Sequence, residues 1–149
     1  MKLFLDANVL LDVLLARQPF VNDSERVLSL CAKKVFDGRC SGLTICNLMY
    51  ILCKHCPMDV ARRCMRDFST YVEIVDVKST AVASALQSPN PDFEDVVQAC
   101  CAGECGVDAI VTRDKKGFID SGILVYTPTE LLGTRRAAPH LRESSFSWR

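Results

Sequence analysis

Short apolar segments recur along the chain, and most of the segments between them carry the apolar spacing of amphipathic helices. The first apolar segment ends at Leu5, and the helical pattern of residues 8–15 follows it almost at once. Strands separated by helices pair in parallel through right-handed crossovers, and the helices then cover both faces of the sheet. The sequence therefore predicts an α/β fold with a mostly parallel central sheet flanked by helices.

Turn residues and helix caps set the limits of the predicted elements. Asp37-Gly38 is expected to end the second helix, and Thr44 is expected to cap the third. No periodicity is sustained beyond Gly133, so we expect one domain over residues 1–132 and a flexible tail over residues 133–149. The predicted strands are 2–5, 40–43, 71–77, 107–112 and 123–126, and the predicted helices are 8–15, 22–36, 45–52, 59–68, 80–87, 92–104 and 127–132.

The charge balance limits the partners that the chain can have. It contains 18 basic and 18 acidic residues, so it lacks the broad positive field of a protein that coats nucleic acid, and any nucleic-acid contact must be local. No apolar stretch approaches the roughly 20 residues needed to cross a membrane. Asp6 also interrupts the apolar start where a signal peptide needs a continuous apolar segment. These features predict a cytoplasmic protein with no membrane contact.

Nine cysteines are present, an odd number, and most lie inside apolar segments. This pattern predicts buried free thiols and argues against a disulfide framework. Cys53 and Cys56 with His55 between them have the one zinc-like spacing, and Cys101 with Cys105 would supply a second pair. Zinc ligand pairs usually lie on polar turns, whereas Cys53 continues an apolar helix face, so we prefer the buried-thiol interpretation.

Three acids lie where a parallel sheet would place its carboxyl edge. Asp6 follows the first predicted strand, Asp114 follows the strand 107–112, and Asp95 lies in the first turn of the helix 92–104. Ligands of open α/β sheets bind at the carboxyl ends of the strands. Capping offers a second explanation, since Asp6 is suited to begin a helix and Asp114 to stabilise a turn.

If these ends share one rim, the three carboxylates meet and raise one another's pKa. A divalent cation relieves that repulsion, and Mg²⁺ and Mn²⁺ prefer oxygen ligands. Such an ion leaves a coordinated water as a nucleophile and an open face for a phosphate oxygen.

Four other acids are less suited to such a site. The presence of Asp92 and Glu94 is explained by the preference for acids in the first turn of a helix. Asp12 is expected to be solvated, and Asp108 precedes its strand and so lies at the wrong end of the sheet.

Four segments resemble the PIN domain and occur in the order of that family: FLDANVLLDVLL, LTICNLMYIL, DFEDVVQACCA and AIVTRDKKGF. The resemblance runs from Met1 to about Leu132 and is strongest to the bacterial branch that includes VapC-type toxins. It implies a small α/β/α sandwich that acts as an endoribonuclease, hydrolysing RNA phosphodiesters with Mg²⁺ or Mn²⁺. It also implies an antitoxin protein as a partner and points to a homodimer.

In that family a quartet of acids at the carboxyl edge of the sheet binds the metal ion. By position, Asp6 matches the first acid, Asp95 the third and Asp114 the last, and the resemblance makes them metal ligands and catalytic residues. Asn47 stands where many members carry a Glu as the second acid. Asn keeps a carbonyl oxygen that can assist, but it lacks the charge and cannot be a general base. Gly117 stands where the family often has a further acid.

Three more side chains are expected next to these ligands. Asn8 resembles a polar residue of the family and is expected to orient Asp6 or a bound water. Thr112 is expected to reach the surroundings of the metal through its hydroxyl. Glu94 is a candidate to replace the missing charge. Its side chain and that of Asp95 leave the helix about 100 degrees apart, so we do not expect both to reach one metal ion.

Arg113, Lys115 and Lys116 adjoin Asp114 and are expected to contact the RNA backbone, since phosphate contacts position a strand without reading its sequence.

An alternative function is a catalytically weakened PIN-like module that binds RNA or another protein. A phosphatase-like hydrolase with Asp6 as nucleophile is a third possibility. That class expects an acid two residues later, where this chain has Asn8.

Overall fold

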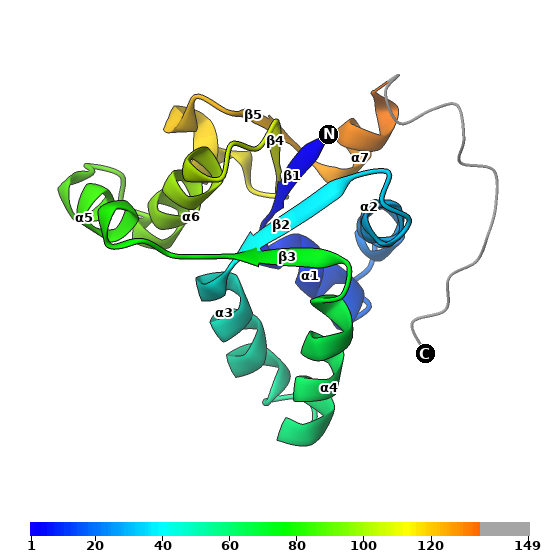
Figure 1. Ribbon diagram of the computed structural model, residues 1–149. Helices are drawn as coiled ribbons and strands as arrows, with labels where there is room; N and C mark the ends of the chain where they lie inside the picture. The colour runs from blue at the N-terminus through cyan, green and yellow to red at the C-terminus, as the bar shows by residue number, and fades with distance from the viewer. Residues whose placement is uncertain (135–149) are drawn as a thin grey trace.

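The structure, a computed structural model, describes residues 1–134, and these form a five-stranded sheet in which every pair of neighbouring strands is parallel. The strand order is β3-β2-β1-β4-β5, so β1 lies at the centre (Figure 1). This confirms the predicted α/β class and makes the sheet wholly parallel. The strands are β1 (Lys2–Leu5), β2 (Asp37–Ser41), β3 (Val72–Val75), β4 (Ala109–Val111) and β5 (Leu124–Tyr126).

Helices connect the strands along the described part of the chain. The predicted closing helix is present, and Thr127 and Glu130 form its capping box, with Pro128 at its start. A 3₁₀ helix between β4 and β5, η1 (Lys115–Ser121), had no counterpart in the sequence prediction. The α-helices are α1 (Ala7–Leu14), α2 (Val21–Ala32), α3 (Gly42–Leu52), α4 (Met58–Phe68), α5 (Ser79–Gln87), α6 (Phe93–Glu104) and α7 (Pro128–Gly133).

The central strand sends successive side chains into two different core layers. Leu3 and Leu5 pack with residues of α1, α2, α3, α4 and α7, whereas Phe4 packs with residues of α5, α6 and η1. Figure 1 shows α5 and α6 together on the side of the sheet away from α1 and α2. The result is the predicted α/β/α sandwich, with both faces of the parallel sheet covered by helices.

The boundary between α2 and β2 differs from the prediction. Asp37-Gly38 does not end a helix, because α2 stops at Ala32 and the pair opens β2. Gly38 is buried there and lies against Cys31, so the glycine serves a close approach between strand and helix. Thr44 was also expected to cap α3, but Ser41 does so, with its hydroxyl oxygen accepting a hydrogen bond from the Thr44 amide at 3.1 Å.

The cysteines are all free thiols, as predicted, but the expectation that most are buried was wrong. Cys31, Cys40 and Cys101 are buried, whereas Cys46 and Cys53 are exposed because α3 turns that side of its surface to solvent. Burial raises the pKa of Cys31 and of Cys40 to about 12, which keeps both thiols protonated and unreactive.

Two other expectations concern the ends and the surface of the chain. Of the predicted tail, only Gly133 and Thr134 belong to the described residues, and the rest lies outside them. Within residues 1–134, no helix combines the length and the apolar character that a membrane span requires.

We predict that Gly38→Ala destabilises the fold, because the added Cβ would lie 2.7 Å from Cys31 Sγ and 3.2 Å from Cys31 Cβ. Overpacking of this kind costs about 1–3 kcal/mol in the free energy of unfolding, which urea denaturation measures. Gly103→Ala is the matched control, because nothing lies within 4 Å of a Cβ at that helical position. It should leave stability unchanged or raise it by up to about 1 kcal/mol. Equal stability of the two variants would contradict the packing argument.

Candidate functional site

The register of two central strands brings Asp6 and Thr112 together. Leu5 of β1 lies opposite Val111 of β4, so the residues that follow them leave the sheet side by side at its carboxyl edge. The Asp6 amide continues the pairing by donating to the Val111 carbonyl at 3.0 Å. The Thr112 hydroxyl then donates to Asp6 Oδ2 at 2.7 Å, which joins two residues 106 positions apart.

The Asp6 side chain faces this contact and does not cap α1. Its backbone occupies the N-cap position, but its carboxylate makes no capping hydrogen bond. The Asn8 amide group instead donates to Asp6 Oδ2 at 2.6 Å, while Asn8 Oδ1 accepts from the Arg113 amide at 3.1 Å. Asp6 is only 7% exposed. Burial raises the pKa of Asp6, the Thr112 hydroxyl opposes that rise, and the charge of Glu94 adds to it.

Asp114 begins η1 and is tied to the same hydroxyl. Its amide donates to Thr112 Oγ1 at 3.0 Å, so one threonine side chain links Asp6 to the loop that carries Asp114. Asp114 Oδ1 accepts from the Lys116 amide at 3.1 Å and caps the 3₁₀ helix. Asp114 therefore acts as a cap, as the second explanation predicted, and its side chain is exposed at the edge of the sheet.

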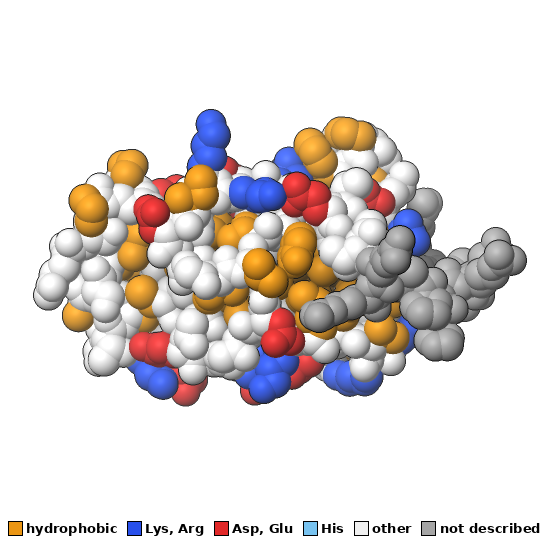
Figure 2. Space-filling model, turned by 90° about the horizontal axis from the view of Figure 1, so that it is seen from above, with side chains coloured by type: hydrophobic (Ala, Val, Ile, Leu, Met, Phe, Trp, Pro, Cys, Tyr) orange, Lys and Arg blue, Asp and Glu red, His pale blue; other side chains and the backbone are white. Residues whose placement is uncertain are grey.

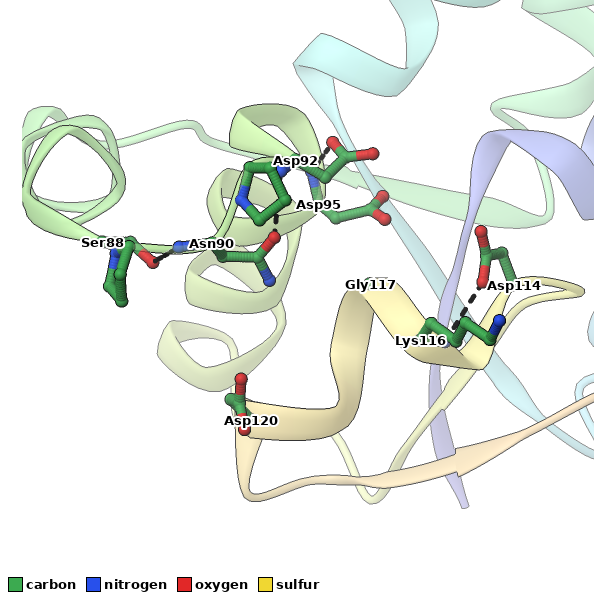
Figure 3. Close-up of a pocket in the computed structure, with 10 residues that line it drawn as sticks. Ser88, Asn90, Asp92, Asp95, Asp114, Lys116, Gly117 and Asp120 are labelled. Carbon is green, nitrogen blue, oxygen red and sulfur yellow. Dashed lines mark hydrogen bonds between the residues drawn. The ribbon is translucent and has the colours of Figure 1, made fainter.

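Asp95 reaches this edge from the first turn of α6. Asp92 caps that helix by accepting from the Asp95 amide at 3.1 Å. In Figure 3 the Asp95 carboxylate extends from α6 toward the wall that carries Asp114. Burial raises the pKa of Asp95 to about 7, and the charges of Asp92, Asp6, Asp114 and Glu94 contribute to the rise. The acids that the sequence singled out therefore lie close enough to affect one another.

These acids share one edge without meeting at one point. Within residues 1–134, no three Asp, Glu, His or Cys side chains are close enough to hold a metal ion as they stand. No ion pair of this part of the chain involves Asp6, Asp95 or Asp114, so Lys and Arg do not neutralise their carboxylates. The donors are all oxygens, and magnesium usually takes only one or two carboxylates directly and keeps several waters.

Gly117 of η1 leaves room for the Asp95 carboxyl group. A Cβ added at Gly117 would lie 2.5 Å from Asp95 Cγ and 3.0 Å from Asp95 Cβ, closer than real contacts allow. The place where the family resemblance suggests a further acid is therefore filled by the side chain of Asp95.

A groove of about 690 Å³ opens beside Asp95 and Asp114. One wall is the segment Ser88–Asp92 that leads into α6, and the other is η1 with Lys116 and Asp120 (Figure 3). Its volume falls in the range typical of ligand sites, which is roughly 300–1,000 Å³.

Asn47 of α3 points to Glu94 of α6, and its amide group donates to Glu94 Oε1 at 2.5 Å. Behind this contact lies a buried network that the sequence analysis missed. The Ser41 hydroxyl donates to Gln98 Oε1 at 2.7 Å, and Gln98 Nε2 donates to Thr44 Oγ1 at 3.0 Å. A glutamine inside the apolar run Val96-Val97-Gln98-Ala99 was the available signal, since a buried amide needs partners.

Asp12 is fully buried, and the expectation that it is solvated was wrong. Its Oδ2 lies 3.1 Å from Arg113 Nε and accepts from the Ser24 hydroxyl at 3.1 Å, because α2 and the loop after β4 cover that side of α1. Burial raises the pKa of Asp12, and the charge of Arg113 opposes the rise. Asp108 was placed correctly at the opposite edge of the sheet, where it accepts from the Lys2 amide at 2.7 Å.

The three cations near Asp114 have different surroundings. Arg113 pairs with Asp12 and lies over the Phe20 ring at 4.3 Å, while Lys115 pairs with Glu130 at 3.0 Å. Lys116 forms no ion pair with any described residue and lines the groove. On the face seen in Figure 2, acidic and basic side chains are mixed. Any attraction for a phosphate backbone must therefore be local.

Comparison with solved structures shows the same fold in three bacterial proteins. The chain resembles FitAcB from Neisseria gonorrhoeae with a TM-score of 0.64 and 17% identity, over 85% of this chain and 98% of that one. It resembles VapBC2 from Rickettsia felis, bound to a promoter DNA fragment, with a TM-score of 0.63 and 16% identity, over 85% and 98%. A toxin-antitoxin complex from Klebsiella pneumoniae gives a TM-score of 0.61 and 20% identity, over 86% and 98%.

Comparison by sequence gives the family. No curated protein matches the chain at a significant level. A family model described as the PIN domain matches residues 2–116, which include the whole network around Asp6 together with Asp95 and Asp114. The chain belongs to the PIN domain family.

Proposed function

We propose that this protein is a metal-dependent endoribonuclease and that Asp6, Asp95 and Asp114 hold a divalent cation. The observation that carries the proposal is the set of three carboxylates at the carboxyl edge of the sheet, which have no Lys or Arg partner within residues 1–134. Two of them, Asp95 and Asp114, line an open groove. Membership in a family whose members are generally nucleases supports it.

The donor set suits Mg²⁺ or Mn²⁺, since all the candidate ligands are carboxylate oxygens and the site has no thiol or imidazole. A bound ion would offset the mutual repulsion of the acids, lower the pKa of a water and polarise a phosphate oxygen.

The chain's own residues have separate tasks in this proposal. Asn8 and Thr112 hold Asp6 Oδ2 in place, so the central ligand is oriented before anything binds. In the metal-free protein the pKa of Asp95 is about 7, so near neutral pH this carboxyl group must release its proton before it can hold the ion. Lys116, on the wall of the groove, is placed to contact a phosphate oxygen of the RNA.

A protein partner is also proposed. The Klebsiella pneumoniae neighbour is described as a toxin-antitoxin complex, and this supports a toxin role for the present chain with an antitoxin as its partner. A gene for a small protein next to this one would strengthen that assignment. The alternative of a weakened binding module rests on Asn47, which replaces an acid by an amide, and on Gly117, which stands where the family often has a further acid.

We expect the purified protein to cleave single-stranded RNA in the presence of Mn²⁺, and Asp6→Asn to lower the rate by about a hundredfold or more, because the variant removes a charged ligand. Gel analysis of a labelled RNA measures both rates. Asp59→Asn is the control, since this exposed acid on α4 forms an ion pair with Arg63 and with no other described residue. Equal cleavage by the wild type and Asp6→Asn would reject the nuclease proposal, and RNA binding independent of Mn²⁺ would favour the binding module.

A second prediction concerns pH. The pKa of Asp95 is about 7 in the folded protein and 3.8 as its ordinary value, so the folded state binds more protons between these values. The free energy of unfolding of the metal-free protein should therefore fall as pH rises from about 4 to 7. Because ligands must be deprotonated, the affinity for Mn²⁺ should rise from pH 6 to pH 8. Calorimetry and urea denaturation measure the two trends.

Asp95→Asn is the control for this pH prediction. Asp6 and Asp12 also have raised pKa values, so some loss of stability with pH should remain in the variant. The difference in stability between wild type and variant isolates Asp95. If this difference is the same at pH 4 and at pH 7, the assignment of a raised pKa to Asp95 is wrong.

A further inference from the structure

We infer that Glu94 supplies the fourth carboxylate of the site and that Asn47 holds it in position. In many family members the acid lies at the position of Asn47 on α3. Here the acid would be Glu94 of α6, and Asn47 would donate the hydrogen bond that holds it. This inference rests on the proposed metal-dependent function.

The direct contact is the first step. Asn47 Nδ2 donates to Glu94 Oε1 at 2.5 Å, from the middle of α3 to the first turn of α6. An amide group can donate to a carboxylate without cancelling its charge, whereas Lys or Arg would neutralise it. Glu94 takes part in no ion pair within residues 1–134, so its charge remains available.

The packing behind this pair fixes where the two side chains meet. Thr44 lies one turn before Asn47 on α3, and Gln98 lies one turn after Glu94 on α6. Residues one turn apart share a helix face, so the buried bond between Gln98 and Thr44 and the exposed bond between Asn47 and Glu94 are successive contacts of one helix pair. The exposed contact of Glu94 with Asn47 therefore continues a buried contact of the same two helices.

The same contact places Glu94 beside the position of the family's second acid. Asn47 stands at that position, and its Nδ2 lies 2.5 Å from Glu94 Oε1. A glutamate at position 47 in addition to Glu94 would set two carboxylates against each other where one hydrogen bond now exists. The identity of residue 47 therefore depends on that of residue 94.

A simpler explanation is available for Glu94. Acids are favourable in the first turn of a helix because they interact with the helix dipole, and this preference alone accounts for its presence. The two explanations differ in what they predict for metal binding. A residue that only stabilises the helix end would alter stability slightly and leave the affinity for Mn²⁺ unchanged.

The test compares Mn²⁺ binding by calorimetry, and the rise in Tm caused by Mn²⁺, among variants of the full chain. Glu94→Gln is expected to weaken Mn²⁺ binding about tenfold or more while the metal-free protein stays folded. Glu104→Gln is the matched control at the other end of α6, where the acid contacts Lys78 and Thr80, and should bind as the wild type does.

The exchange itself is tested by reversing it. Asn47→Glu alone is expected to lower the Tm of the metal-free protein, because it brings a second carboxylate against Glu94. The double variant Asn47→Glu with Glu94→Gln keeps one acid and one amide in the contact, and its Mn²⁺ affinity should return to within about threefold of the wild type. If the double variant binds Mn²⁺ as weakly as Glu94→Gln alone, the proposed exchange of the acid and the amide is wrong.

Asp6→Asn distinguishes a failure of this inference from a failure of the proposed function. If Asp6→Asn abolishes Mn²⁺ binding and Glu94→Gln binds normally, the cation site stands and the role of Glu94 is rejected. If Asp6→Asn also binds Mn²⁺ as the wild type does, the proposed site is wrong, and the inference about Glu94 is overturned with it.

Discussion

The parallel pairing of β1 with β4 is the constraint on which the site depends. With Leu5 opposite Val111, Asp6 and Thr112 must leave the sheet together, and their side chains bond across the gap between two distant parts of the sequence. The hydroxyl of Thr112 also accepts from the amide of Asp114, and Asn8 accepts from the amide of Arg113, so these two side chains set the loop after β4 relative to β1. A shift of one residue in this register would turn Asp6 away from its partners.

Concentrating acids at one edge opposes folding, and two buried polar networks beside that edge join the surrounding elements. Asp12 and Ser24 join α1 and α2 to Arg113 in the loop after β4. Ser41, Thr44 and Gln98 join α3 to α6. In the network of Ser41, Thr44 and Gln98 the polar groups satisfy one another, whereas in the first network Asp12 Oδ1 is buried without a hydrogen-bond partner among the described residues. Both networks tie neighbouring helices together near the candidate site.

Much of this arrangement could be predicted from the sequence, because it depends on local signals. Apolar runs marked the strands, and the ends of two of them placed Asp6 and Asp114 at one edge of the sheet. The start of the helix 92–104 placed Asp95 there. The errors have tertiary causes. From the sequence Gly38 was expected to end a helix, but it lies in a strand because it packs against Cys31. Asp12 was expected to be solvated, but α2 covers it. The contact between α3 and α6 is likewise invisible without the packing of the two helices, and nothing in the residues after Asp114 predicted the 3₁₀ helix.

Gly117 also limits how a sequence of this kind can change. Because the Asp95 side chain occupies the space that a side chain at position 117 would need, the two positions cannot vary independently. An acid introduced at position 117 is obstructed as long as Asp95 keeps its present rotamer, and it becomes acceptable only after α6 or that side chain has moved. The order of substitutions therefore matters. Along a mutational path, a further acid at position 117 requires an earlier or simultaneous change in the position of the Asp95 side chain.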